Sequence, residues 1–286
     1  MNFWVMQGMN GLAFGAVLFI LASGFSLIFG LMRVANLAHG AYFMLGAYVG
    51  LAALDGGWSF WAAVLAGGVT VCILGGLVER LILRRLAGQP LAQVLVTLGI
   101  AFMIADGCLW IWSGDPRPVP MPEGFGGVFR LAGFVFPKYR VFVVVVAVAL
   151  ALALWLLLER TRIGAMIRAG VDDMEMARAM GIPTSLLFSA VFCLGSALAG
   201  AGGVLAGPIL SVYPGLDADM LPLALVVVIL GGVGSLAGAF LGSLVIGLIY
   251  SYGQALVPDL AYVVLFLPMV LVLTLRPTGL LGRRLA

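Results

Sequence analysis

The side chains that most often carry chemistry are scarce in this chain. Its single lysine, Lys138, follows Pro137, so no glycine-rich P-loop with a phosphate-binding lysine is present. The one histidine, His39, excludes a site built from several histidines, and no Gly-x-Ser-x-Gly nucleophile elbow occurs. The sequence therefore predicts no catalytic residue, no metal site and no cofactor bound by this chain, which is expected not to be an enzyme.

Serine and cysteine leave little further chemistry. Intramembrane hydrolysis would need His39 and a serine on separate helices, but serines in membrane helices usually hydrogen-bond to helix backbones. The candidates in apolar runs are Ser23, Ser26, Ser196 and Ser243. The three cysteines are far apart and lie within or near apolar runs, where free cysteine packs as a small hydrophobe. No disulfide is predicted among Cys72, Cys108 and Cys193.

Two polar residues, Asn36 and His39, lie three apart in RVANLAHGAY and so share a helix face. They could bond backbone groups freed at a helix break or re-entrant segment, or they could line a translocation path. The sequence favours the structural role and leaves the second open.

Asp106 lies inside an otherwise uncharged run from Leu91 to Trp112. An intramembrane carboxylate is costly and is by default functional or paired. Because Asp106 is near the outer end of its run, helix capping or an ion pair explains it equally well. The sequence leaves a place on the path and a structural role open.

A polar segment from Glu159 to Pro183, called the island below, places four arginines and four acidic residues between two apolar runs. Asp172 with Glu175 fits a capping box that uses aspartate in place of serine or threonine. Gly181 fits the position just after a helix end, with Pro183 two residues later. These signals predict a helix of about two turns.

The island also carries two apolar faces. Met174, Ala177 and Gly181 would form a narrow face of small and apolar residues, and a preceding helix would carry the stripe Ile163, Met166 and Ile167. The island is either a solvated loop resting on lipid headgroups or an element that docks in a groove on another protein. The caps and the small-residue face favour docking.

The elements that must position these residues are membrane spans. The chain has 286 residues, of which 63% are hydrophobic and 9% charged, and its mean hydropathy is +1.19. A soluble domain has about 45–50% apolar and 25% charged residues. Uncharged runs recur at the roughly 20 residues that cross a bilayer. The sequence predicts one all-α domain over residues 1–286 with nine spans, or eight if the second is re-entrant.

Charge and glycine patterns add orientation and packing. If the island lies in the cytoplasm, each successive span moves the next loop to the other side of the membrane. Eleven of the fifteen basic residues then lie inside, among them Arg33, Arg283 and Arg284. The N-terminus is then outside and the C-terminus inside, and no cleaved signal peptide is expected. Glycine pairs at four-residue spacing predict close helix packing at Gly11/Gly15 and Gly46/Gly50.

Three motifs together resemble the branched-chain amino acid ABC transporter permeases, the integral membrane subunits of LivH and LivM type. They are RVANLAHGAYFMLGAY from Arg33, ERTRIGAMIRA with MARAMGIP in the island, and GGVGSLAGAFLGSLVIG from Gly231. The resemblance covers nearly the whole chain in length and order of spans. It implies a permease subunit of an importer for branched-chain or related small amino acids in a bacterial inner membrane.

The resemblance also implies partners. A second, LivM-type permease would complete the path, two cytoplasmic ATPase subunits would use ATP and Mg, and a periplasmic binding protein would deliver the substrate. Membrane lipids would surround the chain, and no nucleic acid is expected. Glu175 and Ala177 are similar to the Glu-Ala-Ala of importer coupling loops, whereas Met176 departs from it. By this match the docking residues are Arg168, Asp172, Asp173, Arg178 and Gly181.

Other functions remain open at this point. Permeases of this type include relatives that carry urea, amides or small aromatic acids, and apolar spans do not distinguish these substrates. An ion-coupled secondary transporter is a further alternative, although such transporters usually use carboxylates or broken helices at mid-membrane. This chain offers only Asp106, near one edge.

Overall fold

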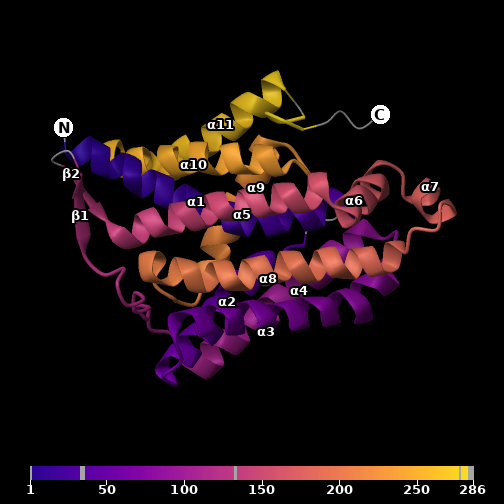
Figure 1. Cartoon of the computed structure of the whole chain (residues 1–286), viewed down its shortest axis with the longest axis horizontal. Helices are drawn as coiled ribbons and strands as arrows, with labels where there is room; N and C mark the ends of the chain where they lie inside the picture. The colour runs from indigo at the N-terminus through magenta and orange to yellow at the C-terminus, as the bar shows by residue number, and fades with distance from the viewer. Residues whose placement is uncertain (1, 33–35, 132–133, 277, 283–286) are drawn as a thin grey trace.

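The computed structural model describes residues 2–32, 36–131, 134–276 and 278–282, which form a helical bundle with one small β-hairpin (Figure 1). The α-helices are α1 (Asn2–Met32), α2 (His39–Asp55), α3 (Phe60–Leu81), α4 (Pro90–Trp112), α5 (Lys138–Arg160), α6 (Arg162–Asp172), α7 (Met174–Ala179), α8 (Thr184–Leu210), α9 (Leu216–Gly231), α10 (Leu236–Leu256) and α11 (Ala261–Leu275). Two 3-10 turns, η1 (Leu83–Leu86) and η2 (Pro258–Leu260), and the strands β1 (Val128–Leu131) and β2 (Phe134–Pro137) complete the described structure. The predicted all-α membrane bundle is confirmed, whereas the hairpin was not predicted.

Nine of these helices correspond in order to the nine predicted apolar runs. Six are long and apolar enough to cross a bilayer, namely α1, α3, α4, α5, α8 and α10. The other three are shorter, with 17 residues in α2, 16 in α9 and 15 in α11. A 17-residue helix rises only about 25 Å, less than the hydrocarbon thickness of about 30 Å. The bundle therefore has six full-length spans and three shorter apolar helices within the described residues.

Close backbone contacts hold the centre of the bundle together. A Cβ atom on Gly15 of α1 would lie 2.6 Å from the Ser243 carbonyl oxygen of α10, and one on Gly46 of α2 would overlap the Gly200 backbone of α8. Only glycine allows helices to approach so closely. The close packing predicted from the four-residue glycine spacing is thus confirmed at both positions.

The chain alternates between two ends of the bundle (Figure 1). At the hairpin end, Arg117 Nη2 lies 2.8 Å from Asp55 Oδ2, and the Arg117 and Val212 backbones exchange hydrogen bonds of 2.8 and 2.9 Å. These contacts bring together the end of α2 and the segments that follow α4 and α8. The island lies at the opposite end, as the alternation predicts. The predicted cytoplasmic residues Arg33, Arg283 and Arg284 lie outside the described residues.

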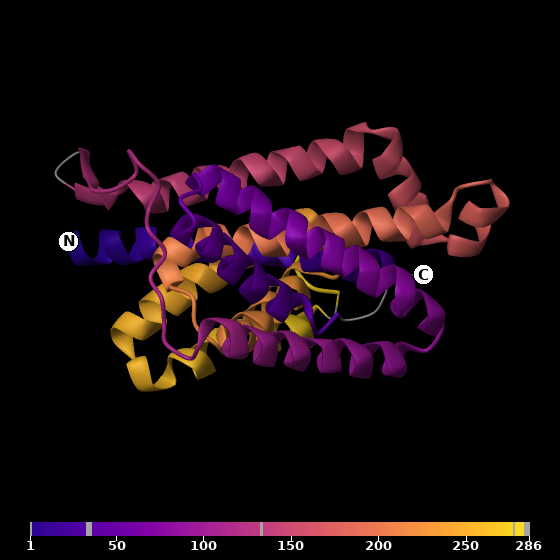
Figure 2. The ribbon, with the colours of Figure 1, turned by 90° about the horizontal axis from the view of Figure 1, so that it is seen from below.

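Helices α4 and α5 lie along opposite edges of the bundle (Figure 2). Helix α4 contacts mainly α2 and η1 in this chain. Its buried residues, Gln93, Thr97, Ala101 and Cys108, lie on one face. The remaining face is therefore open to lipid or to another subunit.

Candidate functional site

The island folds into two short helices, as predicted, but its cap differs from the prediction. Asp173, with φ −147° and ψ 105°, is the N-cap of α7, and its Oδ1 accepts a hydrogen bond from the Met176 N–H at 2.9 Å. Asp172 is instead the last residue of α6. The predicted capping box from Asp172 to Glu175 is wrong because α6 continues through Asp172, so only Asp173 has the extended backbone that a cap requires.

Gly181 ends α7 as predicted. Its φ is +82°, which favours glycine, and its N–H donates to the Arg178 carbonyl at 3.0 Å. The Ile182 N–H donates to the Ala177 carbonyl at 3.0 Å. Together these bonds form a Schellman motif, which satisfies carbonyls that the helix end would otherwise leave unpaired.

The small-residue face of α7 is turned toward the rest of the chain. Ala177 is only 3% exposed, and Met174 packs against an apolar cluster that includes Ile167 and Leu187. The opposite face carries Met176 and Met180, with exposures of 59% and 76%. The predicted use of the Met174–Ala177 face for insertion into a partner is therefore wrong, because α7 uses this face to pack on its own chain.

Arg178 anchors α7 to the next span. Its Nε donates a 3.0 Å hydrogen bond to Oγ1 of Thr184, the first residue of α8. The short helix is thus held at its start by Asp173, at its end by Gly181 and to α8 by Arg178. Figure 1 shows α7 at the far end of the molecule, beyond the ends of the long helices.

An ionic network joins α3 to the start of α8. Glu79 is 2% exposed, and Arg84 Nη2 lies 3.2 Å from Glu79 Oε1. The same Nη2 donates to the Ser185 carbonyl at 3.0 Å and to Ser189 Oγ at 2.6 Å. This network was not predicted from the sequence. The acidic residue Glu79 at the end of an apolar run was the signal that could have indicated a buried ion pair.

Four of the five expected docking residues, Asp172, Asp173, Arg178 and Gly181, are exposed at the island end. Arg168 differs, because it is half-buried and borders a cavity of about 710 Å³. Its Nη1 is buried without a hydrogen bond and lies 3.5 Å from Glu159 Oε2. Below, this space is called the island cavity.

Asn36 and His39 lie where α2 begins against α1. The Asn36 Oδ1 accepts from the Ala38 N–H at 3.1 Å, and the His39 Nε2 donates to the Leu21 carbonyl at 3.0 Å. Both side chains are buried, and the Asn36 Nδ2 and His39 Nδ1 have no partner among the described residues. The Asn36 bond holds a backbone N–H at the start of α2, and the His39 bond ties α2 to a carbonyl within α1, as a structural role predicts. A place on the translocation path stays a prediction.

Asp106 is exposed on α4, six residues before the helix ends at Trp112. Around it, Met103 is 76% and Trp110 88% exposed. Within the described part of the chain, Asp106 has no hydrogen bond or ion pair. The carboxylate is therefore exposed and is not paired within the described bundle, and its place on the translocation path stays a prediction.

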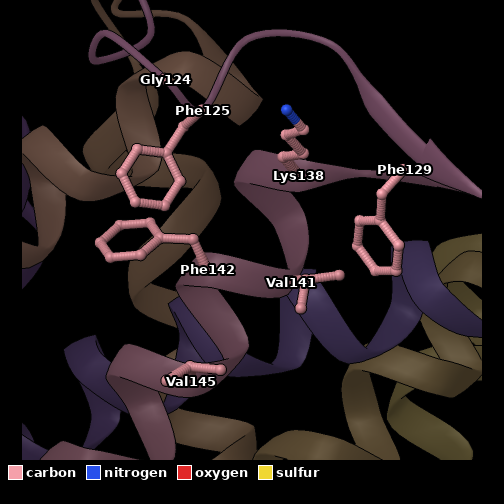
Figure 3. Close-up of a pocket in the computed structure, with 7 residues that line it drawn as sticks. All are labelled: Gly124, Phe125, Phe129, Lys138, Val141, Phe142 and Val145. Atoms are coloured by element: carbon pink, nitrogen blue, oxygen red, sulfur yellow. The ribbon is translucent and has the colours of Figure 1, made fainter.

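The hairpin end has a shallow hollow of about 450 Å³ between the β1 region and α5 (Figure 3). The Phe125 and Phe142 rings lie 4.5 Å apart between centroids. Figure 3 shows the Lys138 amino group pointing away from Val141 and Val145. This part of the hairpin end thus combines an aromatic surface with one exposed cation.

Comparison with known proteins adds the family context. The chain matches the family described as branched-chain amino acid transport system / permease component over residues 8–273. It is 29% identical over 295 residues to the high-affinity branched-chain amino acid transport system permease protein BraD of Pseudomonas aeruginosa, covering 98% of this chain and 96% of that protein.

A second relative is the high-affinity branched-chain amino acid transport system permease protein LivH of Escherichia coli K12. It is 30% identical over 302 residues, with the same coverage of 98% and 96%. The fructose import permease protein FrcC of Rhizobium meliloti is 29% identical over 203 residues, covering 66% of this chain and 54% of that protein. No solved structure matches the chain.

Proposed function

Because the chain belongs to the family of permease components of branched-chain amino acid transport systems, we propose that it is the membrane subunit of an ATP-driven importer for branched-chain or related small amino acids. The chain supplies part of the path and no ATPase site. Separate subunits bind ATP and Mg and provide the energy. Matches to LivH and BraD over 98% of the chain support this assignment.

The observation that carries the coupling part of the proposal is the exposed surface of α7. Met176 and Met180 project from a helix of six residues that is fixed at both ends. Methionine adapts to irregular apolar grooves, and a short helix with an apolar face suits a groove on a partner. The importer has two ATPase subunits, one for each permease. The ATPase subunit that pairs with this chain binds at α7, with Asp172, Asp173 and Arg178 at the polar rim of the contact.

The second permease packs against α4. A lipid-exposed carboxylate costs about 2.5–3.5 kcal/mol at the centre of a span and less toward its end, where Asp106 lies without a partner in its own described chain. A LivM-type subunit with a hydrogen-bond donor at this depth would remove that cost. Asp106 then lies at the seam between the two permeases and beside the path.

The orientation follows from the charge pattern. The island end faces the cytoplasm of a bacterial inner membrane, with the C-terminus on that side and the N-terminus outside. The periplasmic binding protein delivers its amino acid at the opposite end, where the hairpin and the Phe125–Phe142 surface are exposed. The membrane subunits need only a translocation path for the zwitterionic substrate and no tight binding site, because the binding protein supplies the affinity.

The test is uptake of radiolabelled leucine into proteoliposomes that contain this chain, the second permease, the ATPases and the binding protein. Uptake should require ATP inside the proteoliposomes and the binding protein outside, and an ion gradient should not replace ATP. Transport that follows a proton or sodium gradient without ATPase subunits would instead identify a secondary transporter.

Substrate identity has its own test, calorimetry on the binding protein encoded beside this chain. Leucine, isoleucine or valine is the expected ligand. Tight binding of urea, an amide or an aromatic acid would overturn the amino acid assignment while leaving the importer class in place.

A further inference from the structure

The island cavity is lined by residues of α5, of α6 and of the turn that joins α9 to α10. Its volume of about 710 Å³ is in the range of roughly 300–1,000 Å³ found for small-molecule sites. Segments far apart in the sequence line it, including Ser26 of α1, Ser235 at the start of α10 and Thr278 after α11. The cavity therefore exists only when the whole island end is assembled.

Among the described residues, three charged ones line this cavity. Glu159 lies in the last turn of α5 beside Arg168, and Asp172 lies one turn after Arg168 on α6. The buried Arg168 Nη1 makes no hydrogen bond, and its 3.5 Å distance to Glu159 Oε2 exceeds an ordinary charge-assisted bond of about 2.7–2.9 Å. The Arg168 side chain as a whole is 34% exposed, so its guanidinium can also bind an anionic group that enters the cavity.

Apolar residues line much of the remaining surface. Trp155 and Leu158 share a face of α5 with Glu159, whereas Ile229, Leu236 and Leu273 come from α9, α10 and α11. A ligand that fills the cavity must therefore combine charged groups at one end with an apolar body at the other.

We infer that the island cavity binds an apolar zwitterion, with its anionic group at Arg168, its amine at Glu159 and Asp172, and its apolar body against Ile229, Leu236 and Leu273. Two sources share this chemistry, a free amino acid with an apolar side chain and an aminophospholipid, whose acyl chains are apolar. The described lining residues carry charges of both signs, which match a zwitterion better than an ion of one sign.

An occupant of this cavity touches both the island and the turn between α9 and α10. When the occupant is a cytoplasmic amino acid, its binding there holds α6 in place and lowers uptake as product accumulates. This regulatory role rests on the proposed importer function, whereas the ligand chemistry does not.

The first arm of the test measures radiolabelled leucine binding to the purified complex without its binding protein. Nanodiscs of phosphatidylglycerol are used because this lipid has no amine. Arg168→Gln should weaken binding about tenfold or more, because hydrogen bonds to charged groups contribute about that factor. Arg162→Gln is the matched control, since Arg162 is exposed on the same helix and does not line the cavity.

The second arm repeats the measurement in phosphatidylethanolamine nanodiscs and uses native mass spectrometry to detect retained lipid. Ala237→Phe, which fills the cavity without changing a charge, should act like Arg168→Gln in both arms. Leucine binding that depends on Arg168 identifies the free amino acid, and lipid retention that depends on Arg168 identifies the headgroup.

The proposal is overturned if neither ligand binds, or if Arg168→Gln and Arg162→Gln behave alike in both arms. Uptake driven by ATP in the same preparation would leave the proposed importer function standing in that case. Uptake without ATP, together with leucine binding at Arg168, would overturn the importer function and keep the site.

Discussion

Helices α7 and α4 both expose a surface that their own chain does not cover, but the two are stabilised in opposite ways. The six-residue α7 depends on local polar bonds, from Asp173 to Met176, from Gly181 to Arg178 and from Arg178 to Thr184. The 23-residue α4 has an exposed stripe of Met103, Asp106 and Trp110. Asp106 on this stripe has no polar partner in the described chain.

The difference follows from the solvent each helix meets. A helix of six residues in water is marginal unless caps and packing hold it, so α7 keeps its shape through the bonds at its two ends. A long apolar helix in lipid satisfies its backbone internally and needs no such support. An unpaired carboxylate on that helix is the feature on which the proposed contact between α4 and a second permease rests.

The strongest test of this contrast is Asp106→Leu. If a second permease supplies a donor to Asp106, removing the carboxylate strands that donor and weakens pairing by about 2–5 kcal/mol. If Asp106 faces lipid, the same change stabilises the chain, by less than the roughly 2.5–3.5 kcal/mol that applies at the centre of a span. Co-purification of the second permease and thermal melting in nanodiscs distinguish these opposite signs. Asp106→Asn, which keeps a hydrogen-bonding oxygen, should retain most of the pairing.

Arg84→Ala tests how the island end is anchored. It leaves the buried Glu79 carboxylate without its ionic partner. Breaking a fully buried pair costs about 3–5 kcal/mol, and the partial exposure of Arg84 reduces the expected loss to about 2–3 kcal/mol. Thermal melting of the purified chain measures the change. The exposed neighbour Arg85 is the matched control, and equal effects of Arg84→Ala and Arg85→Ala would show that the network contributes nothing to stability.

A change of both exposed methionines tests the α7 surface directly. Met176→Asp with Met180→Asp should cost about 2 kcal/mol or more in ATPase binding, because central apolar contacts dominate such interfaces. ATPase co-purification and leucine uptake should fall about thirtyfold while melting of the chain stays unchanged. Replacement of both residues by leucine should preserve binding. Normal co-purification of the aspartate variant would contradict the docking role and support the interpretation of the island as a solvated loop.

Much of this contrast could be predicted from local sequence. Runs of about 20 apolar residues indicated the nine helices. Gly181 with Pro183 indicated the end of α7, because the positive φ of a helix stop is a local requirement. The glycine pair Gly11/Gly15 indicated close packing, because small residues at one-turn spacing have few other uses in a membrane.

The features that escaped prediction depend on distant parts of the chain. Asp172 and Asp173 are both good caps, and the choice depends on where packing ends α6. Ala177 could equally have faced a partner, and its burial depends on how α7 packs against α6 and α8. The setting of Arg168 was also hidden, because α1, α10 and the segment after α11 complete its cavity.

The smallest expected effect separates the two adjacent aspartates. Asp173→Ala removes the oxygen that accepts the Met176 N–H, and loss of such a cap costs about 1 kcal/mol, or about a fivefold change in helix population. Hydrogen exchange at the Met176 and Ala177 amides should accelerate by that factor. Asp173→Asn keeps the acceptor and should exchange like the wild type, and Asp172→Ala removes a carboxylate without removing the cap. If Asp172→Ala accelerates exchange more than Asp173→Ala, Asp172 is the cap and α7 begins one residue earlier. The stability of α7 without a partner would then come from its packing on α8.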